Sequence, residues 1–368
     1  MVKICLMFNH FQHQDGVSRS AVAIANHIVE RNLAEVTLIS IFKDEKAFHN
    51  QLNPNIKFKK VLGFYFHGLP HILNLIPISW INYKVLNEPY DIVIGFQETL
   101  SIKCIAAFNK NKSAIKIAWQ HCFFDWLLPT LRNDYERIGR VVCVSRDNAV
   151  RLKKELPSVN IDYSYNPIDE QIVQRCGEES INLIKPNNCL LFVSVARMSP
   201  EKGYERLLKI CRRLLNEGFM FKLWLVGDGP ILSDLKKQTT EFALEDCVTF
   251  VGRQNNPHKF TSKADAFICS SFIEGYSTAC TEAIMLGVPV ISTSVSGAQE
   301  IIDDAECGMV VKMDDESLYE GMKEVLTNPS IIEKWKNQLK FTRERFYAKT
   351  RLQRLIKILE LNNENGEN

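Results

Sequence analysis

Short apolar runs alternate with amphipathic helical stretches along this chain, and no other feature of the sequence constrains its fold as strongly. Runs rich in Val, Ile and Leu that are bounded by helices are typical of parallel strands covered on both faces of a sheet. This repeated alternation predicts an α/β protein built from doubly wound parallel sheets. The predicted strands are Lys3–Phe8, Val36–Phe42, Ile56–Leu62, Asp91–Phe96, Ile115–Trp119, Val141–Ser145, Ile161–Tyr165, Cys189–Ala196, Phe221–Val226, Val248–Val251, Ala266–Ser270, Val288–Thr293 and Met309–Val311.

The chain has 368 residues, which is enough for two domains of ordinary size. No strong strand pattern lies between Pro167 and Asn187, so we interpret this stretch as a linker. We therefore expect a first domain over residues 1–170 and a second over residues 185–340. One long basic helix is predicted from about Lys334 to Leu361, and the polar residues 362–368 should follow it as a frayed end.

The composition excludes several classes of protein. With 46% hydrophobic and 24% charged residues, the chain has the balance of a soluble globular protein, and a formal net charge of +2 implies no general affinity for nucleic acid. Its 11 cysteines form no CxxC pair and no regular framework, which favours free thiols in a reducing compartment. The first residues enter a strand directly, so no targeting segment is expected. We therefore expect a cytoplasmic protein.

The segment Val61–Ile81 is apolar enough to be compared with a membrane span. Two prolines, two histidines and an asparagine interrupt it, whereas a spanning helix needs about 20 mainly apolar residues, so the sequence predicts no span here. Its aromatic residues are flanked by lysines, and this mixture also suits the surface of an anionic bilayer. Two interpretations stand: a buried crossover and loop of the first domain, or a contact with the inner face of the plasma membrane.

Two glutamates, Glu274 and Glu282, have seven residues between them. Glu274 follows a predicted strand in a turn of small residues, and Glu282 lies inside an apolar helix that ends at Gly287. Side chains in these two places can face one crevice at the carboxyl end of a sheet, where open α/β folds bind ligands. The layout favours the ligand site of a nucleotide-sugar enzyme. The alternative is a helix-capping glutamate followed by an exposed one.

A hydrolase pair is a further interpretation of the two glutamates. It is disfavoured because hydrolase carboxylates normally face each other across a bond, whereas these two share one wall. The turn between them can itself contact a ligand, since Gly275 lets backbone approach closely and the amides of Tyr276, Ser277 and Thr278 open the next helix. We expect Glu274 to hydrogen-bond sugar hydroxyls and Glu282 to accept both hydroxyls of a ribose.

Two cations flank another predicted helix start. Arg197 and Lys202 follow the Cys189–Ala196 run, and Ser199-Pro200 between them suits an N-cap and a first helical residue. Two fixed cations at a strand exit suit a diphosphate, although a pair of solvated surface cations is the plainer interpretation. Arg253, after the turn Val251-Gly252, is a weaker candidate for the same ligand, because a structural turn explains that sequence adequately.

Several nucleotide and metal signatures are absent from the sequence. No GxGxxG fingerprint follows the first strand, which disfavours a dehydrogenase, and no GxxxxGK[ST] loop exists, which excludes a P-loop enzyme. No cluster of His, Cys and Asp has metal-ligand spacing. The sequence therefore predicts no metal and no cofactor beyond the substrate nucleotide.

The first half of the chain contributes two further candidates. Gly16 lies in a loop before a helix predicted from Ser20 to Arg31, where backbone amides can meet a phosphate. His121 closes the strand that begins at Ile115, so it lies at a carboxyl end. A lone histidine is more often structural than functional, but the position of His121 at a strand end favours a functional role equally, so both interpretations stand.

Together these residues resemble the retaining glycosyltransferases of family 4, which have the GT-B fold. Three segments carry the resemblance: VARMSPEKGYERLL, VGDGP with VGRQNNP downstream, and SSFIEGYSTACTEAIMLGVPVISTSVSGAQEII. The match is strongest from Leu190 to Ile302, and EGYSTACTEAI is most similar to capsular, exopolysaccharide and O-antigen transferases. The family often has two glycines in its first loop, whereas Asp15 precedes a single Gly16 here.

The resemblance implies two facing Rossmann-like domains, with the donor on the second, the acceptor on the first, and the last helix, about 345–368, crossing back to the first. It implies that Arg197 and Lys202 hold the donor diphosphate, that Glu274 meets the donor sugar and that Glu282 meets the ribose. His121 and Gly16 match family positions near the reacting sugar. Protein cations and helix amides would stabilise the leaving diphosphate, so no metal is needed.

The expected function is a retaining, metal-independent glycosyltransferase. It would move a hexose or N-acetylhexosamine from a nucleotide-diphosphate sugar, UDP first and GDP second, to a glycan acceptor that is lipid-linked, in surface polysaccharide biosynthesis. An epimerase or phosphorylase of the same fold is the alternative enzyme, and conversion of the nucleotide-sugar without acceptor would reveal an epimerase. A non-catalytic glycan-binding homologue is the alternative outside enzymes, and it would be expected to lack some of the two cations and two glutamates.

Overall fold

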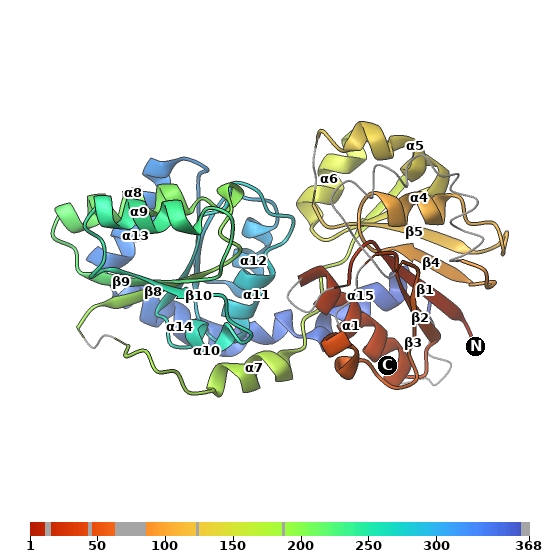
Figure 1. The fold of residues 1–368 in the computed structure, drawn as a ribbon, viewed down its shortest axis with the longest axis horizontal. Coiled ribbons are helices and arrows are strands. Elements are labelled where there is room, and N and C mark those ends of the chain that lie inside the picture. Colours follow the sequence, from red (N-terminus) through yellow and green to blue (C-terminus); the bar gives the residue numbers. More distant parts are fainter. Residues whose placement is uncertain (12–15, 43–45, 63–85, 123–124, 186–187, 362–368) are drawn as a thin grey trace. The chain divides into compact units, whose positions relative to one another are not determined.

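A computed structural model gives the fold of residues 1–11, 16–42, 46–62, 86–122, 125–185 and 188–361 (Figure 1). The chain divides into two units, the first made of Met1–Pro167 with Arg351–Asn368 and the second of Ile168–Thr350. Each unit contains one sheet, and the strand pairs of both sheets are parallel. The prediction of doubly wound parallel sheets is therefore confirmed.

The first unit is built on a seven-stranded sheet in the order β3-β2-β1-β4-β5-β6-β7. Its elements are β1 Lys3–Phe8, α1 Gly16–Glu30, β2 Glu35–Ser40, η1 Lys46–Gln51, β3 Lys57–Lys60, β4 Ile92–Gly95, α4 Leu100–Ala106, β5 Ile115–Gln120, α5 Leu128–Ile138, β6 Arg140–Cys143, α6 Arg146–Glu155 and β7 Asn160–Tyr163. The strand order reverses between β1 and β4. Right-handed crossovers consequently put α1 on one face of the sheet and α4 to α6 on the other (Figure 1).

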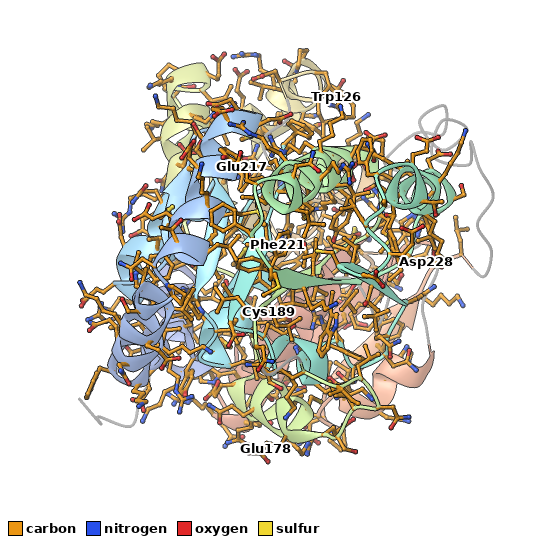
Figure 2. The ribbon with its side chains drawn as sticks, turned by 90° about the vertical axis from the view of Figure 1, so that its left-hand side faces the viewer. Trp126, Glu178, Cys189, Glu217, Phe221 and Asp228 are labelled. Carbon is orange, nitrogen blue, oxygen red and sulfur yellow. The ribbon has the colours of Figure 1, made fainter. Side chains whose placement is uncertain are left out.

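The second unit is built on a six-stranded sheet in the order β10-β9-β8-β11-β12-β13. Its elements are α7 Glu170–Glu178, β8 Leu190–Val195, η2 Pro200–Lys202, α8 Tyr204–Asn216, β9 Phe221–Val226, α9 Leu232–Glu241, β10 Val248–Gly252, α10 His258–Thr261, β11 Ala266–Cys269, α11 Thr278–Met285, β12 Val290–Thr293, α12 Ala298–Ala305, β13 Met309–Val311, α13 Asp315–Thr327, α14 Ser330–Thr342, η3 Arg343–Phe346 and the start of α15 Ala348–Ile358. Figure 2 labels Phe221 at the start of β9 and Asp228 just beyond its end. The order reverses between β8 and β11.

Both sheets have apolar strands because helices cover both of their faces. In β1 every residue from Ile4 to Phe8 is buried, and in β8 every residue from Leu191 to Ser194. Full burial of an aliphatic or aromatic side chain stabilises the fold by about 1.5–3 kcal/mol. Each of the thirteen predicted runs corresponds to a strand whose ends differ from the prediction by no more than two residues.

The stretch interpreted as a linker is part of the second unit. It contains α7, whose N-cap Asp169 accepts hydrogen bonds from the amides of Gln171 and Ile172. The helix packs on α10 and α11, and a Cβ at Gly177 would lie 2.4 Å from the Leu286 side chain. The second unit consequently begins at Ile168 and ends at Thr350, beyond both ends of the predicted 185–340 range.

The prediction of a single long helix from Lys334 to Leu361 is wrong. Two helices, α14 and α15, are separated by η3 and by Tyr347, which is extended at φ −66° and ψ 147°. A residue that is distant in the sequence stabilises this break. The Glu170 carboxylate accepts a hydrogen bond of 3.0 Å from the Ala348 amide and so caps α15. From Arg351 onward the chain belongs to the first unit, where the Arg354 guanidinium lies 3.7 Å from the centre of the Tyr163 ring.

Two further expectations concern segments at the edge of the described residues. The helix predicted from Ser20 begins at Gly16, so Gly16 is in its first turn rather than in a loop before it. Of the Val61–Ile81 segment, residues 63–81 lie outside the described residues. Within the described part of the chain no helix combines the length and the apolar character needed to cross a bilayer.

Candidate functional site

The candidate site of the second unit lies where the strand order reverses, at the carboxyl ends of β8 and β11. Two loops meet there, residues 196–203 after β8 and residues 270–277 after β11. The amide of Phe272 donates to the Glu201 carbonyl at 2.7 Å, and the Ser270 hydroxyl donates to the Lys202 carbonyl at 2.9 Å. Gly203 has φ +69°, and a Cβ there would lie 2.1 Å from the Ser270 oxygen, so only glycine permits this approach.

Lys202 and Glu274 form an ion pair at this junction. The Lys202 Nζ lies 2.8 Å from Glu274 Oε1, and the same oxygen accepts a hydrogen bond of 2.7 Å from the Ser271 hydroxyl. The two side chains are 20% and 16% exposed, so a ligand can still reach them. Burial opposes the charged form of Lys202, but the Glu274 carboxylate outweighs it and raises the lysine pKa above its usual value. A cation is therefore fixed at the strand exits.

Arg197 does not share these partners. Its side chain is 70% exposed, and Nη2 lies 3.0 Å from Glu201 Oε1, which also accepts a hydrogen bond from the Ser199 hydroxyl. Burial alone would raise the pKa of Glu201, but the hydrogen bonds from Ser199 and Arg197 lower it. The structure thus places both predicted cations after β8 and gives each a different carboxylate.

Glu282 lies in the second turn of α11, a helix buried along most of its length. Its side chain is 6% exposed, and Oε2 lies 3.7 Å from Nδ1 of His258, which is equally buried on the short helix α10. Sequence reasoning did not select His258, although it follows directly after the VGRQNNP segment. The ribose-binding prediction for Glu282 stays a prediction, and His258 joins it as a neighbouring candidate.

The turn between the two glutamates is closely packed. Ser277 is the N-cap of α11, and its hydroxyl oxygen accepts from the Cys280 amide at 3.3 Å, so part of its hydrogen-bonding capacity serves the helix. Tyr276 is buried against Gly297, whose φ is +76° and where a Cβ would lie 2.7 Å from the tyrosine ring. Gly275 is also buried, and Thr278 is half-buried as the first residue of the helix.

Glycines at the exit of β9 pack closely against the loop that follows β8. Gly227 has φ +148° and would place a Cβ 2.0 Å from the Ala196 oxygen, and a Cβ at Gly229 would lie 2.3 Å from the Met198 oxygen. These glycines therefore serve loop packing. Arg253 follows Gly252 and is exposed, so it lies at the surface of the β10 exit.

His121 lies at the carboxyl end of β5 in the first unit and is held by its neighbours. Its Nε2 donates to the Phe96 carbonyl at 2.9 Å, and Nδ1 then accepts from the Asn166 amide nitrogen at 3.4 Å. Burial lowers the pKa of His121 to about 3, an effect that the hydrogen bond to Phe96 offsets only in part. His121 is therefore neutral near pH 7 and has a defined tautomer.

Polar residues that sequence reasoning missed surround the reversal point of the first sheet, between β1 and β4. The side-chain oxygen Oε1 of Gln97 accepts from the backbone amides of Asn9 and His10 at 2.9 and 3.0 Å. The Glu98 carboxylate accepts from the amides of His121 and Cys122 at 2.6 and 3.0 Å. Their position directly after a predicted strand was the signal available. Gly16 and His121 share this unit, and their role beside the donor stays a prediction.

The described residues include no group of three or more His, Cys, Asp and Glu side chains arranged to hold a metal ion. None of the eleven cysteines, all of which lie in the described part of the chain, forms a disulfide.

The fold matches known structures over nearly its whole length. Anabaena HepE in complex with UDP and glucose superimposes with a TM-score of 0.76 over 98% of this chain and 100% of that chain, at 17% sequence identity. At this identity the likeness shows the fold alone, which is the GT-B fold of two Rossmann-like units. The class of fold is therefore GT-B.

The second unit is similar to a known family. Residues 178–342, which make up less than half of the chain, match the model for glycosyl transferases group 1. The resemblance inferred from the motifs of residues 190–302 is thus confirmed.

Two curated relatives show how far the similarity extends. The N-acetylgalactosamine-N,N'-diacetylbacillosaminyl-diphospho-undecaprenol 4-alpha-N-acetylgalactosaminyltransferase of Campylobacter jejuni is 30% identical over 52% of this chain, and the match spans about half (50%) of that relative. The lipopolysaccharide core biosynthesis glycosyltransferase LpsD of Rhizobium meliloti is 23% identical over 89% of this chain and 90% of its own length.

Proposed function

We propose that this protein is a retaining, metal-independent glycosyltransferase of surface polysaccharide biosynthesis. It would transfer a hexose or N-acetylhexosamine from a nucleotide-diphosphate sugar, with UDP favoured over GDP, to a lipid-linked glycan acceptor. The observation that carries the proposal is the pairing of Lys202 with Glu274 at the reversal point of the second sheet. The relative from Campylobacter, whose name specifies a diphospho-undecaprenol acceptor, supports a lipid-linked acceptor.

The two ends of the proposed donor site have different chemistry. Lys202 and Arg197 would meet the diphosphate, with the amides that open α11 close by. Glu274 would accept hydrogen bonds from hydroxyls of the sugar, and Glu282 would accept hydrogen bonds from the hydroxyls of the ribose. Binding a diphosphate must divide Lys202 between Glu274 and the phosphate oxygens, so the ion pair of the free protein becomes a shared contact.

The chemical step would be a displacement on one face of the sugar. The bond between the anomeric carbon and the diphosphate oxygen breaks, a bond to the acceptor hydroxyl oxygen forms on the same face, and the hydroxyl proton passes to the leaving diphosphate. Fixed cations and helix amides favour this step because they stabilise the charge that develops on the leaving group. No metal is then required for that charge.

A screen of nucleotide-sugars tests the proposal. The melting temperature of the protein would be measured with UDP, GDP and their hexose and N-acetylhexosamine conjugates, because a ligand that binds the native state raises apparent stability. Ligands that raise it would then be given to the enzyme with a lipid-linked glycan acceptor, with and without EDTA. The expected product has the anomeric configuration of the donor, and its yield is unchanged by EDTA.

Three results would contradict the proposal in different ways. Absence of binding and turnover with every nucleotide-sugar would remove the transferase function. Inversion at the anomeric carbon would overturn the retaining mechanism alone, and loss of activity in EDTA would overturn metal independence alone. Conversion of the donor to another nucleotide-sugar without acceptor would favour an epimerase.

The place of the protein in the cell is part of the same proposal. A lipid-linked acceptor would bring a cytoplasmic enzyme to the inner face of the plasma membrane. Sedimentation with vesicles that contain anionic lipid tests this, with vesicles of neutral lipid as the control. If the protein pellets with neither kind of vesicle, the proposed peripheral location is contradicted.

A further inference from the structure

Arg206 is a buried arginine on a helix face that is otherwise apolar. The helix α8 buries Tyr204, Leu207, Leu208, Ile210, Cys211 and Leu214 together with it. The Arg206 side chain is only 3% exposed, and the nearest carboxylate, Asp315, lies 3.9 Å away and is exposed. A guanidinium that is buried without a close anion needs other acceptors.

Backbone carbonyls supply those acceptors. Arg206 Nε donates to the Ser270 carbonyl at 2.9 Å, and Nη2 donates to the same oxygen and to the Ser271 carbonyl at 2.9 Å. Nη1 donates to the Met313 carbonyl at 3.0 Å. The guanidinium carbon also lies 3.9 Å from the centre of the Phe272 ring. One side chain thus contacts all three residues of the segment Ser270–Phe272.

The segment is held from its other side as well. The Thr293 hydroxyl, at the end of β12, donates to the Ser271 carbonyl at 2.6 Å. Two residues further along the chain from this segment stands Glu274, whose carboxylate carries the sugar-end contact in the proposed function. By contrast, Glu282 lies within α11, outside the segment that Arg206 contacts.

We infer that Arg206 is a positioning residue that fixes Glu274 for the sugar end of the donor without touching the donor itself. This inference rests on the proposed function. A planar fork that binds three carbonyls leaves the Ser270–Phe272 segment little freedom. Loss of the fork would let Glu274 move, and a displacement of about 1 Å at a reacting centre costs about 100-fold in rate. The ribose contact proposed for Glu282 would keep its geometry, because Glu282 lies on α11.

Two measurements separate the sugar end from the nucleotide end. Calorimetry gives the Kd for UDP, which lacks the sugar. The rate of UDP release from UDP-glucose, UDP-galactose, UDP-N-acetylglucosamine and UDP-N-acetylgalactosamine, with and without acceptor, gives kcat and KM at the sugar end. A purely structural role would move both measurements together.

Arg206→Met keeps much of the apolar stem and removes the fork. We expect UDP affinity within about twofold of the wild type and kcat for UDP release about 100-fold lower. Arg206→Lys keeps a charge and at least one carbonyl contact, so it should recover about tenfold of that loss. Arg213→Met is the matched control, because Arg213 is on the same helix and lies 3.4 Å from the centre of the Tyr319 ring but pairs with Glu316 at the surface. It should match the wild type in both measurements.

The outcomes decide the inference. Wild-type kcat in Arg206→Met, or an equal fall of UDP affinity and kcat, would overturn it while the proposed function stands. If Arg206→Met does not fold, Arg206→Lys decides, with about a tenfold loss of kcat and unchanged UDP affinity expected. Failure of both variants to fold would make Arg206 a residue of the fold and overturn its positioning role. If the wild type binds neither UDP nor any UDP-sugar, the proposed function fails first.

Discussion

The two sheets reverse their strand order in the same way but place different chemistry at the reversal point. In the first unit, the side-chain oxygen Oε1 of Gln97 and the carboxylate of Glu98 accept hydrogen bonds from the chain's own backbone, and His121 is neutral. In the second unit, Lys202 and Glu274 are charged and remain partly exposed. The same topology therefore provides one polar edge whose side chains bond to the chain's own backbone, and one edge with a partly exposed ion pair suited to an anion.

This difference shows which property comes from the fold and which from the residues. Parallel strands bring their carboxyl ends to one edge of a sheet in both units, so both edges gather polar residues. An ion pair forms at the carboxyl edge of the second sheet because Lys202 and Glu274 follow β8 and β11, which are neighbours in that sheet. The predictions below test this contrast, and the largest expected effect comes first.

Replacing Lys202 with Ala should abolish most turnover. The lysine supplies the fixed cation at the second reversal point, and the loss of one such group in a transition state costs about 100- to 1000-fold in kcat. Glu274→Ala should lose turnover to a similar extent, while both variants keep a cooperative thermal transition. Lys209→Ala, an exposed lysine on α8, is the control. Turnover at the wild-type rate in both site variants would refute the assignment of the charged site.

Replacing Glu282 with Gln should weaken nucleotide binding more than turnover. The variant keeps the shape of the side chain and loses its charge, and hydrogen bonds to a charged group are worth about 10- to 100-fold in affinity. Calorimetry with UDP measures this, with Glu320→Gln on the exposed face of α13 as the control. An unchanged Kd would show that the nucleotide is not held by Glu282.

Acid should destabilise the first unit through His121. Its pKa is about 3 in the folded protein and near 6.5 in the unfolded chain, so the unfolded chain binds the extra proton between these values. The stability contributed by the neutral histidine is complete above pH 6.5 and is lost as the pH falls. Between pH 6.5 and 5 this loss is about 1.6 kcal/mol.

The variant His121→Gln isolates this effect. It should show a smaller fall in melting temperature between pH 7.5 and pH 5 than the wild type. His27, whose pKa burial also lowers, to about 4, titrates in the same direction and remains in both proteins, so only the difference between the two is informative. Identical pH profiles would mean that His121 is not held neutral.

The smallest effect is expected from Ser271→Ala. The hydroxyl donates one hydrogen bond of 2.7 Å to Glu274, which keeps its ion pair with Lys202 when that bond is lost. We expect kcat to fall about two- to fourfold with no change in UDP affinity. A loss as large as that of Lys202→Ala would mean that Ser271, rather than the ion pair, positions the carboxylate.

Much of the fold could be predicted because its strands are buried on both faces. A strand such as Phe221–Val226 is then a continuous apolar run, which is visible in the sequence. The long helix predicted over Lys334–Leu361 failed for the opposite reason. Its break at Tyr347 depends on Glu170, which is far away along the chain and caps α15.

The candidate site divides in the same manner. Glu274, Glu282 and Lys202 stand in recognisable local contexts, a strand exit, an apolar helix and a helix start. Arg206 and His258 could not be selected from their local sequence. Each was identified only by its contact with a buried group elsewhere in the chain. Two other predictions have different outcomes. Gly16 lies in the first turn of a helix and not in a loop before it, and residues 63–81 lie outside the described residues.

The sequence by itself determined the alternation of strands and helices and the residue types at the strand exits, because both depend on local patterns of apolar and polar residues. Only the tertiary structure decided that Lys202 and Glu274, 72 residues apart, form one ion pair and that Arg206 binds the segment leading to it. The reason is that neighbouring strands of a parallel sheet are joined by long crossover connections or are not consecutive in the chain at all. Neighbours at its carboxyl edge are therefore distant in sequence, and no local pattern records which side chains will meet there.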